Sequence, residues 1–245
     1  MPTVEDVRFP SRGDRPVVTL AGQLHRFADD RRRPTVLACH PSSRGEAHYN
    51  HPIVRRLTGV LHEAGFNVLR FNLRGIPPSG GTISRGRDEP DDVRGALDFL
   101  ETLPTVDRSR LYVAGHSFGG AMSFTVASQD ERVQGGIALG FPLRALDPSI
   151  PGAPHLYECD REAVLDAIRA WRRPKVFITG ESDRSGPPLK VLEYFLTLAE
   201  PKTFLVIGGS DHFFGQGERR DLDHPGLNQA VQYARRTLLD WAAPG

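Results

Sequence analysis

Short apolar runs alternate with longer amphipathic stretches along most of this 245-residue chain. Short apolar runs of this kind are typical of buried strands, and the longer periodic stretches are typical of helices. Strands that alternate with helices indicate βαβ units, whose strands lie parallel in one sheet. The predicted strands are Thr35–His40, Asn67–Asn72, Arg110–Gly115, Gly136–Phe141, Lys175–Gly180 and Lys202–Gly208; the predicted helices lie near Pro52–Ala64, Pro90–Leu103, Phe118–Ser128, Arg161–Trp171, Pro187–Ala199 and His224–Trp241.

The start of the chain follows a different pattern. Val4–Phe9 and Val17–Phe27 alternate weakly between apolar and polar residues and flank a turn, which predicts two antiparallel strands. With them, the fold is expected to contain a mostly parallel, eight-stranded sheet with helices on both faces. No repeat or linker divides residues 1–245, so we expect a single α/β domain. Its least regular part is Pro142–Asp160. The stretch of residues 143–173 is too short for a full cap domain and is expected to be a minimal, lid-like insertion.

A glycine-flanked serine follows the predicted strand at Arg110–Gly115. Residues 115–120 read GHSFGG, and a helix of small and apolar residues comes next. The pattern G-x-S-x-G between a strand and a helix is typical of a nucleophile elbow. Small neighbours are needed because a Cβ there would clash with the strand or the helix. The turn lifts the Ser117 hydroxyl clear of the sheet and directs the first N–H groups of the helix at the space above it. The alternative is a Gly-rich turn in which Ser117 only caps the helix.

Two later strands end in residues that can activate this serine. Asp183 follows the strand at Lys175–Gly180, and His212 follows the strand at Lys202–Gly208. Both positions lie beyond the carboxyl ends of strands, where ligands bind in open α/β sheets. The chain order serine, acid, histidine is that of Ser–Asp–His hydrolases built on such a sheet. We predict Ser117 as the nucleophile, His212 as the general base and Asp183 as the acid that orients His212.

The identity of the acid stays open at this point. Glu181 lies two residues nearer the end of its strand, Asp211 is the sequence neighbour of His212, and Asp147 follows the preceding strand. A direct neighbour rarely reaches the Nδ1 atom of the same histidine, and the Glu181 side chain can point into the strand packing. Asp183 is therefore preferred, with Glu181 as the main alternative. His212 itself has a second interpretation, as a core histidine or a helix cap.

These segments resemble the α/β-hydrolase superfamily, and within it the small lidless bacterial hydrolases near the dienelactone-hydrolase-like group. The resemblance extends over about residues 17–241 and implies the α/β-hydrolase fold and the triad of Ser117, Asp183 and His212. Two segments depart from the pattern of that group, Ser42–Glu46 in place of paired glycines and Ile76–Pro78 after an Arg-Gly turn. Both border the expected pocket, so the substrate does not follow from the resemblance. Besides the elbow and the acid segment, the likeness rests on His40-Pro41-Ser42-Ser43, Arg70-Phe71-Asn72-Leu73-Arg74-Gly75 and Asp211-His212-Phe213-Phe214.

The fold implied by this resemblance also predicts an oxyanion hole. One donor is the backbone N–H of Phe118, the residue after the nucleophile, and the second comes from the loop after the first parallel strand. Pro41 has no N–H, so we expect the second donor to be Ser42, with Ser43 as the alternative. The same loop continues into polar residues that we expect at the rim of the substrate pocket: Arg44, His48, Tyr49 and Asn50. No carboxylate pattern completes a metal site with these histidines, so no metal is expected.

Composition excludes several other classes of protein. The formal net charge of +1 gives no overall field that would attract nucleic acid or an anionic membrane. No apolar run is long enough to span a membrane. The first residues, Met1–Asp6, lack the features of a signal peptide, and the two cysteines, Cys39 and Cys159, do not suggest a disulfide framework. We expect a cytoplasmic protein whose oligomeric state the sequence leaves open, a homodimer included.

The expected activity is cleavage of a small ester or thioester through an acyl-enzyme on Ser117, with a small-molecule substrate and no cofactor. Two rival functions stay open. An acyltransferase or a lyase on the same fold would use the same serine but not pass an acyl group to water. A binding protein that retained the fold would need no activity, and its expected sign is a broken triad.

Overall fold

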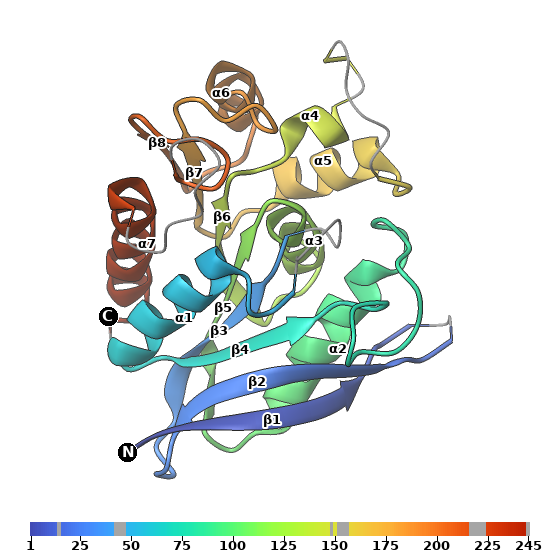
Figure 1. The fold of residues 1–245 in the computed structure, drawn as a ribbon, viewed down its shortest axis with the longest axis vertical. Coiled ribbons are helices and arrows are strands. Elements are labelled where there is room, and N and C mark those ends of the chain that lie inside the picture. The colour runs from blue at the N-terminus through green and yellow to red at the C-terminus, as the bar shows by residue number, and fades with distance from the viewer. Residues whose placement is uncertain (14–15, 42–47, 148, 151–156, 216–223, 244–245) are drawn as a thin grey trace.

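The computed structural model of the chain describes residues 1–13, 16–41, 48–147, 149–150, 157–215 and 224–243. Within these residues, eight strands form one sheet in the order β1-β2-β4-β3-β5-β6-β7-β8 (Figure 1). The strands are β1 (Pro2–Pro10), β2 (Thr19–Phe27), β3 (Arg33–Cys39), β4 (Asn67–Asn72), β5 (Val106–His116), β6 (Val133–Leu139), β7 (Lys175–Gly180) and β8 (Lys202–Ile207). The helices are α1 (Pro52–Glu63), α2 (Glu89–Thr102), α3 (Phe118–Ala127), α4 (Leu143–Leu146), α5 (Arg161–Ala170), α6 (Pro188–Leu196) and α7 (Pro225–Ala242).

The sheet is mostly parallel, as the alternation of strands and helices predicts. β3 pairs in parallel with β4 and β5, and parallel pairing continues from β5 through β6 and β7 to β8. Only β1 and β2 break the pattern within the described residues, since β2 runs antiparallel to both β1 and β4. The inner strands β4 and β7 are buried along their whole length, which explains why both are rich in apolar residues. The edge strand β1 alternates between exposed and more buried positions.

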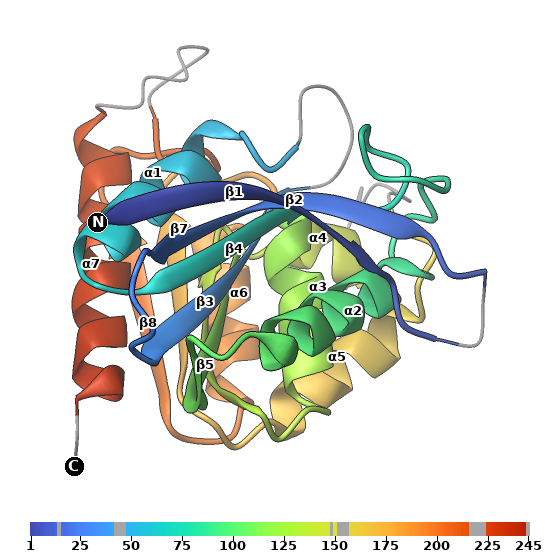
Figure 2. The ribbon, with the colours of Figure 1, turned by 90° about the horizontal axis from the view of Figure 1, so that it is seen from below.

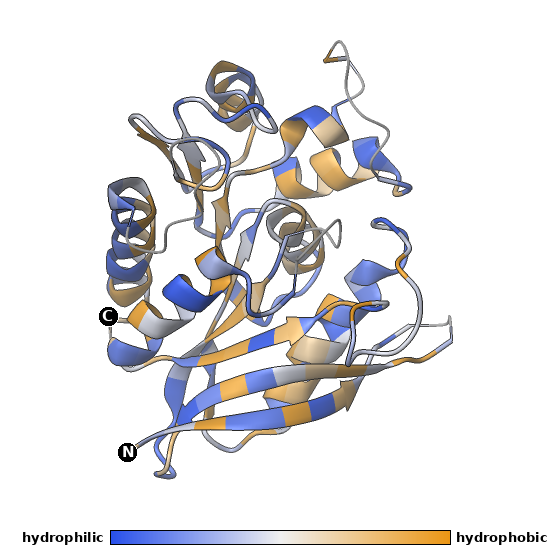
Figure 3. Cartoon of the chain, in the orientation of Figure 1, coloured by the Kyte–Doolittle hydropathy of each residue, from blue (hydrophilic) through white to orange (hydrophobic). Residues whose placement is uncertain are grey.

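Helices cover both faces of this sheet. α1 and α7 lie on one face, and α2, α3 and α5 lie on the other (Figure 2). Each face has its own hydrophobic cluster, one built around residues such as Leu57 and Val231, the other around residues such as Val93 and Val164. The surface helices turn their apolar residues toward the sheet and their charged residues outward, most visibly in α1 and α7 (Figure 3). The predicted fold class is confirmed.

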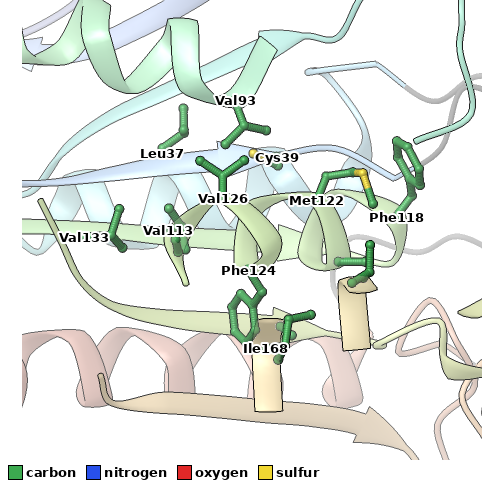
Figure 4. Packing of buried hydrophobic residues seen from close by; sticks show 14 of the residues in the cluster. Leu37, Cys39, Val93, Val113, Phe118, Met122, Phe124, Val126, Val133 and Ile168 are labelled. Carbon is green, nitrogen blue, oxygen red and sulfur yellow. The ribbon is translucent and has the colours of Figure 1, made fainter. Parts of the chain in front are cut away.

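The helix that follows Ser117 is the most deeply enclosed of these elements. All ten residues of α3 are buried. Val126 and Met122 face the side on which Val93 and Cys39 lie, while Phe124 points toward α5 (Figure 4). Small residues along the helix let it lie close to β5 and β6, so a tight apolar environment fixes its first turn. The position of Ser117 is therefore set by the core.

The chain between β6 and β7 contains a short helix that the sequence analysis did not predict. α4 has four residues, too few for helical periodicity to show in the sequence. α5 follows it and is capped by Asp160, whose carboxylate accepts a hydrogen bond from the Ala163 N–H at 3.0 Å. Both short helices lie within residues 143–173, the stretch expected to be a lid-like insertion.

Candidate active site

Ser117 lies on a strained turn between β5 and α3. Its backbone angles are φ 53° and ψ −122°, in a region that residues other than glycine rarely adopt. The turn is held on both sides: the Ser117 N–H donates to the Leu139 carbonyl at 2.9 Å, and the Gly120 N–H donates to the Ser117 carbonyl at 2.9 Å. The residue is 8% exposed. The surrounding structure thus maintains a conformation that the serine would not adopt alone.

The glycines of the elbow are required for steric reasons. A Cβ on Gly115 would lie 2.4 Å from backbone atoms of Gly119 and Gly120. A Cβ on Gly119 would lie 2.4 Å from the carbonyl oxygen of His40, at the end of β3. The backbones of β3, β5 and α3 therefore meet at this turn with no space for a side chain. This is the crowding predicted for the GHSFGG motif.

His212 joins Ser117 and Asp183 into a hydrogen-bonded line. Its Nε2 atom is 2.9 Å from the Ser117 Oγ atom. Its Nδ1 atom is 2.9 Å from one carboxylate oxygen of Asp183 and 2.8 Å from the other. The side chain of Asp183 is 0% exposed and that of His212 is 13% exposed. The carboxylate is thus enclosed, and the histidine reaches the surface only in part.

The candidate acids are distinguished by what they bind. One oxygen of Asp183 also accepts hydrogen bonds from the N–H groups of Ser185 at 2.8 Å and Gly186 at 2.9 Å. The Glu181 carboxylate instead accepts from the Gly209 N–H at 2.8 Å and is exposed. The two remaining candidates also bind backbone N–H groups near them in sequence, Asp211 those of Phe213 and Gly215 and Asp147 that of Ser149. The structure therefore brings Asp183 to His212.

This arrangement fixes the tautomer of His212. A carboxylate accepts hydrogen bonds and does not donate them, so the proton of a neutral ring lies on Nδ1, facing Asp183. Nε2 is then unprotonated and accepts the hydrogen bond of the Ser117 hydroxyl. The geometry suits transfer of the serine proton to the imidazole.

A second histidine, from the elbow itself, supports the loop that carries His212. The Nε2 atom of His116 donates a hydrogen bond to the His212 carbonyl at 2.9 Å. The two rings lie 5.0 Å apart, and His116 also stacks on His51 with centroids 5.3 Å apart. Gly140 leaves space for the His212 ring, because a Cβ on Gly140 would lie 3.1 Å from the Nδ1 atom of His212. The sequence analysis assigned no role to His116, although it is the variable residue of the elbow motif.

His40 ties the end of β3 to the end of β4. Its Nε2 atom accepts a hydrogen bond from the Leu73 N–H at 3.1 Å, so the ring proton lies on Nδ1 and is donated to the Pro41 carbonyl at 2.6 Å. Burial lowers the pKa of His40 to about 4, so the ring is neutral at physiological pH. The imidazole thereby fixes the beginning of the loop expected to carry the second oxyanion donor.

The predictions for the oxyanion hole and for the rim of the substrate pocket have different outcomes. Phe118 is the first residue of α3, where a backbone N–H has no partner within the helix. Ser42, Ser43 and Arg44 lie outside the described residues. Two described members of the rim, Tyr49 and Asn50, form hydrogen bonds within their loop and with β4 that do not involve Ser117 or His212: Tyr49 N–H to Asn72 at 2.7 Å and Asn50 N–H to His48 at 3.0 Å. A contact of this loop with substrate stays a prediction.

The loop after β4 is fixed by buried carboxylates. Arg74 donates to Asp92 through its backbone N–H at 2.8 Å and through its guanidinium at 2.7 Å and 3.0 Å. Farther along, Glu89 accepts from the backbone N–H groups of Ser84 at 2.7 Å and Gly86 at 2.6 Å. Arg74 therefore has the loop-fixing role that its place at a strand end suggests. The loop passes beside the elbow, because the Gly86 α-carbon faces the Phe118 ring.

Tyr157 also reaches the site, from the insertion between β6 and β7. Its ring packs against the ring of Phe118, the residue after Ser117, with centroids 4.9 Å apart. The residue is 9% exposed. Nothing in the sequence around Tyr157 indicated this position, since it lies in the least regular part of the chain.

The family model for the alpha/beta hydrolase domain matches residues 32–242 of the chain. The chain belongs to this family. An uncharacterized protein of Rickettsia prowazekii is 25% identical over 186 residues, which are 74% of this chain and 72% of that protein. One of Mycobacterium tuberculosis is 27% identical over 188 residues, or 73% of this chain and 63% of that protein. The structure of a serine hydrolase without a lid from Xanthomonas campestris covers 98% of this chain and 97% of its own, with a TM-score of 0.71 and 22% identity. This last likeness concerns the fold.

Two features are absent from the described part of this alpha/beta hydrolase, a metal site and a membrane-spanning helix. No group of three or more His, Cys, Asp or Glu side chains there has the arrangement needed to hold a metal ion. None of the helices in that part is both long and apolar enough to cross a lipid bilayer. Both cysteines are free. Cys39 is the buried last residue of β3, and burial raises the pKa of its thiol to about 12. Cys159 lies next to Gly86.

Proposed function

We propose that this alpha/beta hydrolase is a serine hydrolase that cleaves a small ester or thioester through an acyl-enzyme on Ser117. The observation that carries the proposal is the hydrogen-bonded line from Ser117 Oγ through His212 to Asp183, with distances of 2.9 Å and 2.8 Å. A serine hydroxyl alone is a weak nucleophile, and an adjacent base held by a third group activates it. The intact line is the reason to prefer an enzyme over a binding protein.

In the proposed mechanism, Ser117 attacks the substrate carbonyl while its proton moves to Nε2 of His212. Asp183 holds the ring in the tautomer that leaves Nε2 free and stabilises the imidazolium that forms. The carbonyl electron pair moves onto oxygen, where the N–H of Phe118 and a second donor, expected to be Ser42, stabilise the negative charge. His212 then protonates the leaving oxygen or sulfur. Water, deprotonated by His212, hydrolyses the acyl-enzyme and restores Ser117.

The test combines a covalent probe with a panel of substrates. We expect a fluorophosphonate to label wild-type protein at Ser117 and not the folded Ser117→Ala variant. We expect p-nitrophenyl esters of increasing acyl length, with acyl-CoA thioesters alongside, to reveal hydrolysis that the Ser117→Ala variant lacks. Activity that persists in Ser117→Ala would reject Ser117 as the nucleophile.

Isotope-labelled water separates hydrolysis from the rival reactions. A hydrolase places one oxygen of the labelled water in the acid product. An acid product without label, or an acyl group found on another acceptor, would reject hydrolysis and favour an acyltransferase. A well-folded wild-type protein that the probe does not label would favour the binding protein.

A further inference from the structure

The two edges of the sheet differ in how well they are protected from another strand. β1 and β8 lie at opposite ends of the sheet (Figure 1). Charged residues and prolines hinder the pairing of an edge strand with a further strand. β1 carries both kinds: Pro2, Glu5, Asp6, Arg8 and Pro10. β8 reads KTFLVI, so neither a charged residue nor a proline follows Lys202 within the strand.

β8 directs backbone hydrogen-bonding groups away from the sheet. Within the described residues, its one partner strand is β7, which runs parallel to it. The carbonyls of Pro201 and Ile207 accept hydrogen bonds from the β7 side at 3.2 Å and 3.0 Å. Alternate residues of a strand bond to the same neighbour, so the N–H and C=O groups of Phe204 and Val206 point to the open side. The Val206 side chain lies there too, with the residue 42% exposed.

Exposed leucines of α6 lie beside this edge. Leu189 is 75% exposed and Leu196 is 67% exposed. Seven residues, or about two helical turns, separate them, so both lie on one side of the helix. Leu192, between them, is partly buried. We call these three residues the leucine stripe.

The contacts of α6 show which side of the helix carries the leucine stripe. On one side, the Tyr194 hydroxyl donates to a backbone carbonyl of α5 at 2.7 Å, and α5 packs against α3 toward the middle of the sheet. On the other side, the Phe195 ring packs on Phe204 of β8 with centroids 5.4 Å apart. Around the helix, the leucines lie nearer to Phe195 than to Tyr194. The leucine stripe therefore faces the side of α6 at which the sheet ends.

We propose that β8 and the leucine stripe form the interface of a homodimer in which the β8 strands of the two copies pair antiparallel. A two-fold axis perpendicular to the sheet brings this edge opposite itself. Phe204 of each copy can then exchange both backbone hydrogen bonds with Val206 of the second copy. The sheet continues through both copies, and the two α6 helices lie side by side on one of its faces. This assembly does not depend on the reaction proposed for Ser117.

The charges beside the leucine stripe favour a second copy of this chain as the partner. Lys190 and Glu193 are exposed and pair with each other at 2.8 Å. Two antiparallel α6 helices can place Leu189 opposite Leu196 of the second copy. At 1.5 Å per residue, Lys190 then lies within about 3 Å, along the helix axis, of Glu193 of the second copy. Apolar positions thus meet apolar ones and each charge meets its opposite, as a symmetric interface requires.

The first test measures the molar mass of the full chain by light scattering and the Kd of the dimer by analytical ultracentrifugation. We expect wild type to have twice the chain mass of 27.1 kDa. Val206→Lys should raise the Kd on the order of 100-fold, because it places an ammonium group on the open edge of each copy. Val4→Lys is the matched control and should leave the Kd unchanged, since Val4 is an exposed valine of the other edge strand.

Two further measurements test the two parts of the interface separately. Leu196→Glu should raise the Kd on the order of tenfold or more, because it places a carboxylate in the leucine stripe. Amide hydrogen exchange should slow at least about tenfold at Phe204 and Val206 when the protein concentration is raised through the Kd. The Leu205 N–H faces β7 and should be protected at every concentration. Circular dichroism shows whether each variant folds.

Several results would overturn the homodimer. One is a wild-type chain that stays monomeric at the highest concentration at which it is soluble, which would leave this edge to a different partner. Others are a dimer that both Val206→Lys and Leu196→Glu leave intact, or an equal loss of affinity in Val4→Lys. A dimer without slowed exchange at Phe204 would place the interface elsewhere. If Val206→Lys fails to fold, Leu196→Glu and the exchange of the wild-type protein decide.

Discussion

Replacing Asp183 by asparagine tests the proposed triad at its most buried member. The substitution keeps the size of the side chain and exchanges one carboxylate oxygen for an NH₂ group. The Oδ1 atom of Asp183 accepts hydrogen bonds from the N–H groups of Ser185 at 2.8 Å and Gly186 at 2.9 Å. An asparagine must keep its carbonyl oxygen at that position, because an NH₂ group there would face two donors. The NH₂ group is then placed where Oδ2 lies, 2.8 Å from Nδ1 of His212.

This orientation opposes the productive tautomer of His212. An NH₂ group donates hydrogen bonds, so it favours the tautomer in which Nδ1 accepts and the ring proton lies on Nε2, in competition with the carbonyl oxygen that stays 2.9 Å from Nδ1. In the tautomer with the proton on Nε2, the ring cannot take the proton of Ser117. By analogy with the same exchange in serine proteases, kcat should fall on the order of 10⁴-fold, or about 5.5 kcal/mol of activation free energy.

The matched control is Glu181→Gln, which neutralises an acid two residues earlier. Glu181 binds the Gly209 N–H at 2.8 Å, a bond that a glutamine carbonyl can also accept. We expect this variant to keep a kcat close to that of wild type. The assay is p-nitrophenyl ester hydrolysis, with circular dichroism to show that both variants fold. A kcat of Asp183→Asn within about tenfold of wild type, or an equal loss in Glu181→Gln, would refute the assignment of the acid.

Three further predictions concern stability. Since burial lowers the pKa of His40 to about 4, the folded state resists protonation of this ring; the free energy of unfolding should fall by on the order of 3 kcal/mol as the pH decreases from about 6.5 to about 4. Urea titrations across this range should show a smaller fall for His40→Gln, and parallel curves for the two proteins would contradict the prediction. Gly119→Ala places a Cβ 2.4 Å from a backbone carbonyl and should cost at least about 2 kcal/mol, so an unchanged denaturation midpoint would show that the elbow has space. Asp92→Ala leaves the buried Arg74 without its bidentate partner and should cost about 3–5 kcal/mol by urea denaturation; a cost below about 1 kcal/mol would contradict this.

Much of the fold follows from patterns that are local in sequence. β4 and β7 have the predicted bounds, since each is a short run rich in apolar residues that ends at a turn. The elbow could also be predicted from the sequence, because steric crowding at this turn requires glycine at fixed positions. The short helix α4 was missed for the converse reason: four residues contain about one helical turn, and one turn shows no period.

The choice between Asp183 and Glu181 could not be made from local sequence patterns. Both residues follow β7 within three positions, and their distance along the chain does not tell which side chain faces His212. In the structure the difference comes from the turn itself, whose Ser185 and Gly186 N–H groups bind the Asp183 carboxylate. The position of Tyr157 was harder still to predict, since its packing against Phe118 depends on a contact between Glu158 and Arg85 that joins two loops distant in sequence.

Two histidines stabilise the site in the same way, each by donating a ring N–H to a backbone carbonyl. His40 donates to Pro41 at 2.6 Å and so fixes the end of β3, and His116 donates to the carbonyl of His212 at 2.9 Å and so fixes the loop after β8. Each of these histidines acts on the backbone beside a proposed catalytic group and not on that group itself. An imidazole suits this task because it is rigid and can donate from one nitrogen while the other accepts, as His40 does from Leu73 at 3.1 Å. Protonation of His40 would remove that acceptor, so the low pKa of this ring keeps the link between β3 and β4 intact at physiological pH.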